Sequence, residues 1–452
     1  MPATSGARMA HSGSRPGGLA GIAAPSHGPC QHVTMSSAAR RVQRIYLSLL
    51  FFNTLAASLI WGINTLFLLD AGLSNLQAFT ANAFFTAGLV LFEVPTGVVA
   101  DLRGRRTSYL LGTLTLAVST LLYLYSWRVS APFWAWAVSS ALLGLGFTFF
   151  SGAVEAWLVD ALEFSGYEGR LEPVFARGKI VEGVAMLSGS VAGGLIAQAT
   201  NLGVPYVLRT GVLALTLVLA FGWMKDLGFT PARGKSPVRE IRNVLAASLT
   251  HGLRNPRVRW VMWTAPFTMG VNVYAFYAMQ PYLLELHGDP EAYGVAGLAA
   301  AIVAGAQIVG GLVSPHLGRF FGRRTAVLLA STVVSTAVLA LIGLVPSLWA
   351  VILLLVVWGL MSAAVMPVRQ AYLNGLIPSR QRATVLSFDS LLGSSGGVVA
   401  QPLLGRAADV WSYQASYGLT AGFQALAIPF AWLARRAASA PDAAQADSMG
   451  AD

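Results

Sequence analysis

Long apolar stretches recur along nearly the whole chain, separated by short segments that carry Arg, Lys, Asp and Pro. A transmembrane helix needs ~20 apolar residues to cross a hydrocarbon core ~30 Å thick. Lipid offers no hydrogen-bond partner to an open backbone, so these stretches are expected to be helical. The pattern predicts twelve transmembrane helices, at residues 44–69, 78–100, 106–126, 132–162, 173–199, 204–224, 258–286, 292–317, 323–345, 347–376, 383–409 and 413–434.

Basic residues are concentrated in alternate loops of this twelve-span pattern. Examples are Arg40, Arg41 and Arg44 before the first span and Arg103, Arg105 and Arg106 after the second. The opposite face is assigned Arg128, Arg209 and Arg406. Lys and Arg accumulate in cytoplasmic loops, so both termini are predicted to be cytoplasmic and the protein to lie in the cell (inner or plasma) membrane.

The composition supports this assignment. Of 452 residues, 55% are hydrophobic and 11% are charged, whereas soluble proteins carry about 25% charged residues. A soluble enzyme, a nucleic-acid-binding protein and a disordered protein are therefore excluded. The net charge of +11 is explained by orientation without a nucleic-acid partner. The single cysteine, Cys30, rules out an intramolecular disulfide or a Cys-based metal framework.

Five regions are expected along the chain. Residues 1–39 form a polar, disordered tail, within which Met35 is an alternative start, and residues 436–452 form a second tail. Residues 225–257 form a basic cytoplasmic linker between two halves, 40–224 and 258–435. The fold class is therefore an all-α membrane protein with twelve transmembrane helices in two pseudo-symmetric six-helix halves.

An internal repeat links the two halves. Residues 104–111 (GRRTSYLL) match residues 322–329 (GRRTAVLL) at six of eight positions, and both blocks open the third span of their half. The loop before the first block reads Gly97-Val-Val-Ala-Asp101-Leu-Arg103-Gly104-Arg105-Arg106. This loop resembles the signature of the major facilitator superfamily, and the resemblance of the chain to that family covers residues 40–435. Leu102 departs from the usual basic residue, and Arg319 occupies the Asp position of the second copy.

The residue types in this loop predict a structural role for several of its positions. Gly97 allows close helix packing, Gly104 allows a tight reversal, and Asp101 can face the positive end of a helix. The resemblance implies that Asp101 approaches the eleventh helix near residues 387–389, and that Arg105 pairs with Asp160 or Glu163. The expected cytoplasmic gate comprises Gly97, Asp101, Gly104, Arg105, Arg106, Asp160 and Glu163.

Ionisable residues inside the spans are functional candidates because an unpaired charge in lipid is costly. Glu93 and Glu155 are expected at similar depths, where they either carry a proton or form part of the inner gate. Glu182 is a third proton-coupling candidate, although Lys179 lies three residues earlier on the same helical face. Arg369 has no acid at i±3 or i±4, so it either lines the cavity or snorkels to the cytoplasm.

The fifth span carries Gly189, Gly193 and Gly194, which are expected to pack helices closely. This run resembles the glycine motif of drug:proton antiporters in the superfamily, with Ser190 in place of the usual Pro. In those antiporters an Arg precedes a glycine run in the fourth span. Ser140 stands at that position here, so coupling through that Arg is excluded.

The resemblance further implies a substrate cavity lined by the first, fourth, seventh and tenth spans. The candidates are Asn53, Trp61, Asn64, Asn272, Tyr274, Tyr277, Gln280, Arg369 and Gln370. Aromatic rings with a few amides favour an amphipathic, even cationic, small molecule.

The leading hypothesis is proton-coupled, multidrug-type efflux by a monomer whose partners are lipid, substrate and protons. Proton-linked uptake of a neutral metabolite is the alternative, and a transport-inactive sensor or scaffold is more remote. The chain lacks the Walker sequence and any Ser, Cys or His catalytic motif, so neither enzymatic activity nor a metal or cofactor is expected.

Overall fold

The computed structural model describes residues 35–230, 253–378 and 382–438, and these residues are almost entirely helical. Helices suit a lipid environment, because each satisfies its backbone polar groups through its own hydrogen bonds. The helices are α1 (Ser37–Trp61), α2 (Asn64–Asp70), α3 (Asn75–Arg103), α4 (Arg105–Arg128), α5 (Phe133–Thr148), α6 (Ala153–Phe164), α7 (Glu172–Ala199), α8 (Gly203–Trp223), α10 (Pro256–His287), α11 (Tyr293–Phe321), α12 (Arg324–Leu344), α13 (Leu348–Leu376), α14 (Arg382–Val410), α15 (Tyr413–Ala425) and α16 (Ala427–Ala437).

Ten helices in the described chain are long and apolar enough to cross a membrane, which makes the protein an integral multi-pass membrane protein. Two of the ten are formed by consecutive helices, α5 with α6 and α15 with α16. The predicted seventh and eleventh spans correspond to α10 and α14, which have 32 and 29 residues but are not among the ten. Their polar side chains include Asn272 and Gln280 on α10 and Asp389 and Gln401 on α14.

Several predicted spans are interrupted. The first is divided at Gly62 and Ile63, between α1 and α2. The fourth is divided between α5 and α6, where Gly152 has φ +65°. The Ser108 hydroxyl donates to the carbonyl of Phe149 at this break, over 2.7 Å. Such breaks are tolerated at membrane depth because neighbouring side chains satisfy the freed carbonyls.

The ends of the helical region extend beyond the prediction. α1 begins at Ser37, where the Ser36 side chain accepts a hydrogen bond from the backbone N–H of Ala39, so the tail expected over 1–39 ends earlier. Met35 packs against the apolar cluster around Tyr46, and α16 continues to Ala437. The rest of the predicted tails, 1–34 and 439–452, and linker residues 231–252 lie outside the described residues.

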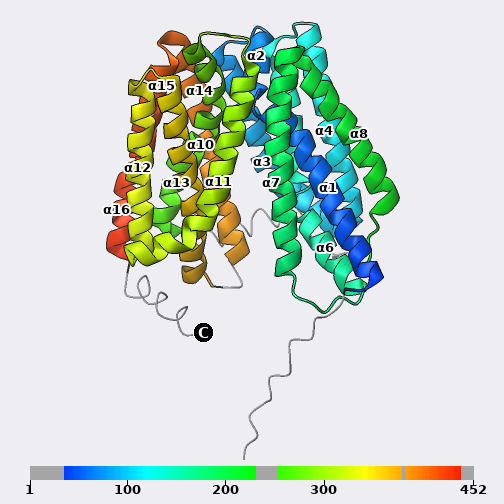
Figure 1. Cartoon of the computed structure of the whole chain (residues 1–452). Helices are drawn as coiled ribbons and strands as arrows, with labels where there is room; N and C mark the ends of the chain where they lie inside the picture. Colours follow the sequence, from blue (N-terminus) through cyan, green and yellow to red (C-terminus); the bar gives the residue numbers. More distant parts are fainter. Residues whose placement is uncertain (1–34, 231–252, 379–381, 439–452) are drawn as a thin grey trace, which may run out of the picture.

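The helices form two bundles that stand side by side in Figure 1, α1–α8 in one and α10–α16 in the other. They meet where α7 packs on α11 and α3 packs on α14. Both described ends of the chain, at α1 and α16, lie at the lower edge of the view. We call this edge the basic end, because Arg40, Arg41, Arg103, Arg106 and Arg435 lie at the helix ends found there. The other edge, which α2 occupies, is the opposite end.

Contacts between the bundles join them toward the opposite end. The Asp409 carboxylate of α14 accepts the backbone N–H groups of Asn75 and Leu76 at the start of α3, at 2.9 and 2.8 Å. The Gln280 side chain of α10 accepts from the N–H of Thr65 and donates to the carbonyl of Trp61, at 2.9 and 2.8 Å. These bonds satisfy backbone groups that the break between α1 and α2 and the start of α3 leave free.

Candidate functional site

A cavity of about 640 Å³ lies between the two bundles, which is within the size range of small-molecule sites. Residues from α1 to α5, α7 and α8 line it on one side, and residues from α10, α11, α13 and α14 line it on the other. Toward the basic end the cavity reaches Glu182, whose side chain is 32% exposed. Toward the opposite end it reaches Asn64 and Arg209, which are buried.

Aromatic rings form much of the cavity wall. Trp61 of α1 lies 5.0 Å from Phe276 of α10, measured between ring centroids, and Phe276 meets Tyr277 edge to face at 5.4 Å. Phe85 and Phe147 form a second edge-to-face pair across α3 and α5 at 5.7 Å. These rings offer large apolar faces in well-defined positions, which suits an organic ligand with an apolar body.

Buried polar atoms without a hydrogen-bond partner also belong to residues that line the cavity. Within the described chain they are Asn53 Oδ1, Asn82 Nδ2, Arg209 Nη2 and Trp358 Nε1. Buried polar groups are ordinarily paired, since leaving one unpaired costs free energy. Four residues that line one cavity therefore carry hydrogen-bonding capacity that no described group uses.

Some predicted cavity residues line the cavity and others do not. Asn53, Trp61, Asn64, Asn272 and Tyr277 are among its lining residues. Tyr274, in contrast to the prediction, is buried in the core, where its ring packs on Phe79 of α3 and its hydroxyl contacts Ser416 and donates to the carbonyl of Leu404.

Two further predicted cavity residues, Gln280 and Gln370, do not line the cavity. Gln280 is fully buried in the contact between the bundles, because its amide satisfies both Thr65 and Trp61 there. Gln370 is exposed and is not among the cavity residues.

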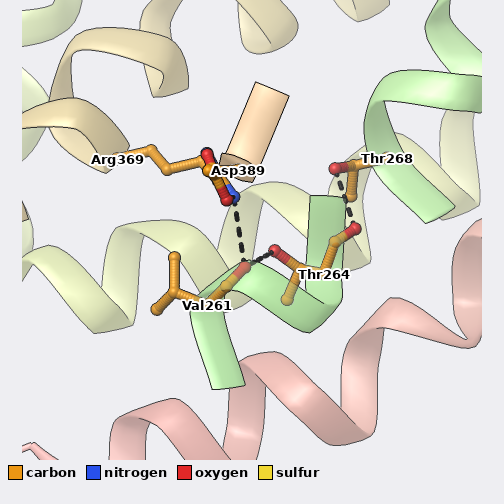
Figure 2. Close-up of polar contacts among 5 residues, drawn as sticks. All are labelled: Val261, Thr264, Thr268, Arg369 and Asp389. Atoms are coloured by element: carbon orange, nitrogen blue, oxygen red, sulfur yellow. Dashed lines mark hydrogen bonds and ion pairs between the residues drawn. The ribbon is translucent and has the colours of Figure 1, made fainter. Parts of the chain in front are cut away.

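Arg369 neither lines the main cavity nor snorkels to the basic end, contrary to both sequence interpretations. Its guanidinium forms a bidentate ion pair with Asp389 of α14, in which Nη2 lies 2.7 Å from Oδ1 and Nη1 contacts Oδ2. Nη2 also donates to the carbonyl of Val261 on α10, over 3.2 Å (Figure 2). The two side chains are only 7% and 5% exposed. Mutual neutralisation explains why both charges are tolerated inside the bundle.

The three candidate carboxylates have different surroundings. Glu182 pairs with Lys179 at 2.8 Å, as their spacing predicts. Glu93 accepts a hydrogen bond from the hydroxyl of Ser151 at 2.6 Å, in the break between α5 and α6. Glu155 lies in the first turn of α6, one helical turn beyond Ser151. Glu93 therefore meets a hydroxyl group near the break.

Five predicted gate residues lie at the junction of α3 and α4, whereas Asp160 and Glu163 lie on α6. Arg105 pairs with Asp101 at 2.7 Å and not with Asp160 or Glu163, because residues 101 and 105 face each other across a single turn. Gly104 has φ +101°, which confirms the tight reversal. A Cβ at Gly97 would meet no described atom within 4 Å outside its own helix, so the predicted close packing at Gly97 is absent from this conformation.

Asp226, just after α8, is an acid that binds the loop between α3 and α4, and the sequence analysis did not single it out. Its carboxylate accepts the backbone N–H of Arg106 at 2.8 Å, at the start of α4. A carboxylate is favourable at a helix N-terminus because it meets unpaired N–H groups and the positive end of the dipole. The Arg106 side chain donates to the carbonyl of Phe221, so α4 and α8 are tied together at the basic end.

Comparison with known families identifies this architecture. The profile of the Major Facilitator Superfamily matches residues 46–321 and 292–450, which together span most of the chain. The chain belongs to the Major Facilitator Superfamily. No curated protein sequence matches it.

Solved transporters share the fold of this superfamily member at low sequence identity. The nucleoside transporter NupG superposes with a TM-score of 0.73 at 11% identity, covering 88% of this chain and 98% of NupG. A POT family transporter in complex with 5-aminolevulinic acid gives 0.67 at 14% identity, covering 88% and 96%. A bacterial homolog of the human lysosomal transporter Spinster, inward-facing and unoccupied, gives 0.66 at 15% identity, covering 89% and 98%.

The glycines of the fifth predicted span lie at tight helix crossings. A Cβ at Gly189 or Gly193 would collide with Ser58 or with the carbonyl of Leu59 on α1. A Cβ at Gly194 would lie 2.9 Å from the Cα of Gly297 on α11, in the other bundle. The run therefore packs α7 against both neighbours, which glycine packing alone explains. The drug:proton antiporter branch is not shown by these contacts.

Arg209 is the cavity residue that the sequence analysis misplaced. It was assigned to the opposite face, but it lies in the second turn of α8 and is 1% exposed. The sequence could have revealed this position. Arg209 lies five residues after the predicted start of the span at residue 204, which places it ~7 Å along the helix axis. An arginine at that depth is a functional candidate by the criterion that selected Glu93 and Arg369.

Proposed function

We propose that this superfamily member is a secondary transporter that moves a small organic molecule by alternating access, with protons as the coupling ion and export as the direction. Twelve transmembrane helices in two pseudo-symmetric halves, with the basic end in the cytoplasm, complete the proposal. The observation that carries it is the 640 Å³ cavity between bundles that are joined at the opposite end. Rocking of the two bundles around such a site would expose it first at one end of the molecule and then at the other.

Export is supported by the end from which the cavity is reached. Glu182 at the basic-end side of the cavity is partly exposed, whereas Arg209 on the other side is buried. The basic end is cytoplasmic under the positive-inside rule, so a substrate would enter this conformation from the cytoplasm. Proton-linked uptake is the second candidate. The buried positive charge of Arg209 repels cationic drugs, so it counts against multidrug-type efflux and favours this alternative.

Proton coupling is supported by the carboxylates near the cavity. Glu182 lines it and pairs with the exposed Lys179, while Glu93 bonds a hydroxyl where the fourth span is interrupted. A carboxylate that alternates between a charged partner and a closed apolar setting would take up and release a proton. Broken helices at membrane depth often mark coupling sites.

The coupling is tested in proteoliposomes that contain a trapped pH dye and the purified full-length chain. We expect Glu93→Gln, Glu155→Gln or Glu182→Gln to abolish solute-driven proton movement while exchange of labelled solute continues, because Gln keeps the shape and removes the ionisable group. Glu168→Gln, in the exposed loop between α6 and α7, is the matched control.

Two outcomes would contradict the proposal. Proton movement that survives in all three variants would remove these carboxylates from the coupling. Net solute transport by the wild-type protein along an imposed solute gradient, without any proton movement, would reject protons as the coupling ion.

A further inference from the structure

Arg209 is a buried cation that has no carboxylate partner in the described part of the chain. Its Nε donates to the hydroxyl of Thr120 on α4 at 3.0 Å, and its Nη1 donates to the carbonyl of Ala56 on α1 at 3.1 Å. These two bonds fix the guanidinium in position but do not neutralise its charge. Nη2 is buried and has no hydrogen-bond partner within the described residues, and the residue borders the main cavity.

The contrast with Arg369 shows what Arg209 lacks. Arg369 is buried to a similar degree, and its charge is balanced by Asp389 through two N–H···O contacts. A buried charge without a counter-charge is costly, which is why buried arginines are found paired. The fixed, incompletely paired guanidinium of Arg209 therefore provides a site for an anionic group that comes from outside the protein.

Other cavity groups favour an anion at the same end. The Tyr206 hydroxyl donates to Asn64 at 3.0 Å, and the Asn64 amide donates to Asn82 at 3.0 Å, which leaves Asn82 Nδ2 without an acceptor among the described residues. The cavity carboxylate, Glu182, lies toward the basic end and is already paired with Lys179. The opposite-end part of the cavity therefore offers hydrogen-bond donors and a positive charge.

The cavity wall indicates the rest of the ligand. Trp61, Phe276 and Tyr277 present aromatic faces next to the polar end. Phosphates and dicarboxylates are typically held by several basic groups, whereas a single guanidinium with an apolar wall matches one carboxylate on an apolar body.

We propose that Arg209 binds the carboxylate of a small organic acid with an apolar or aromatic body, and that this contact determines specificity. The inference rests on the proposed function, since it names the substrate class of the same cavity. It narrows the expectation of an amphipathic, even cationic, molecule, which rested on the aromatic rings and amides of the predicted lining and did not include Arg209.

Equilibrium binding to the purified full-length protein tests this assignment. The probes are phenylpropionate, phenylpropionamide and phenylpropylamine, which share one carbon skeleton and differ in charge. We expect phenylpropionate to bind the wild-type protein roughly 10- to 100-fold more tightly than the amide, as a charge-assisted hydrogen bond implies. Arg209→Gln should remove this preference, and Arg209→Lys should retain part of it because a point charge keeps the attraction but loses the planar fork.

Arg128→Gln is the matched control, because Arg128 is exposed at the end of α4. Arg209→Gln also loses its bonds to Thr120 and Ala56, so its folding is checked by thermal denaturation. The preference of the wild-type protein for the acid over the amide does not depend on the folding of any variant. Equal binding of the three probes, no binding of the acid, or an acid preference that survives in a folded Arg209→Gln would each overturn the proposal.

Binding and transport separate this inference from the proposed function. Arg209-dependent binding of phenylpropionate with no exchange in proteoliposomes would support the site and contradict transport. Exchange of the amine or amide that does not change in Arg209→Gln would support transport and overturn the site.

Discussion

Arg369→Gln and Asp389→Asn are each expected to lower the free energy of unfolding by about 3–5 kcal/mol, because each leaves the other charge buried and unpaired. The pair lies between α13 and α14, and through the Val261 carbonyl it also reaches α10. That carbonyl accepts a second bond from the hydroxyl of Thr264, so three helices share one polar network (Figure 2). Denaturant unfolding of the detergent-solubilised protein measures the loss.

A double variant separates the cost of an unpaired charge from the strength of the pair. Arg369→Met with Asp389→Leu replaces both charged side chains with apolar side chains that fill the same space. It should therefore recover most of the stability lost in either single variant. Lys179→Met breaks a pair in which Lys179 is 80% exposed, and it should cost no more than about 1 kcal/mol. Single variants as stable as the wild-type protein would show that the Arg369–Asp389 pair does not hold these helices together.

Gly194→Leu is expected to destabilise the conformation described here by about 1–3 kcal/mol, because the crossing of α7 and α11 has no room for a side chain. The Cβ alone would lie 2.8 Å from the carbonyl of Tyr293 and 2.9 Å from the Cα of Gly297. A shift of that size changes a two-state population roughly 5- to 150-fold. The bundles should then separate at the opposite end, and the transport rate should fall by a comparable factor.

Cysteine labelling measures this shift directly. Phe85→Cys, placed on the cavity wall in a Cys30→Ser background, should react faster with a membrane-impermeant maleimide from the opposite end when Gly194→Leu is present. Gly211→Leu in α8 is the matched control, because a Cβ there would meet no described atom within 4 Å outside its own helix. Unchanged labelling and transport in Gly194→Leu would show that this crossing does not have to open.

The sequence predicted the helices well, because length and continuous hydrophobicity are local properties. Every predicted span overlaps a helix of the structure. The break after α1 and the break after α5 were not predicted. Gly62 and Gly152 lie in runs that are apolar on both sides, and only the surrounding helices decide whether such a glycine stays helical.

The site could be predicted only in part, because charge pairs in a membrane bundle form between helices. Lys179 and Glu182 were paired correctly since both lie on one helix. Arg369 finds its acid 20 residues away on the next helix, which no helical spacing reveals. Asp226 caps α4 from beyond α8, at a distance of 120 residues from Arg106.

The misplacement of Arg209 had a different cause. The assignment treated basic residues near a predicted span end as markers of orientation, a rule that is sound for loops. Arg209 lies within α8, and its burial depends on α1 and α4, which supply the carbonyl of Ala56 and the hydroxyl of Thr120. Those contacts changed the expected ligand from a cation to an anion.

Distances between spin labels at both ends of the molecule test alternating access most directly. One label pair replaces Phe164 on α6 and Phe320 on α11 at the basic end, where both side chains are exposed. The other replaces Ser130, between α4 and α5, and Ser347, before α13, at the opposite end. Each pair is measured in a Cys30→Ser background, in acidic and alkaline buffer, with and without phenylpropionate. We expect a population in which the basic-end distance shortens while the opposite-end distance lengthens. Distances that stay fixed under every condition, or that change in the same direction at both ends, would contradict alternating access.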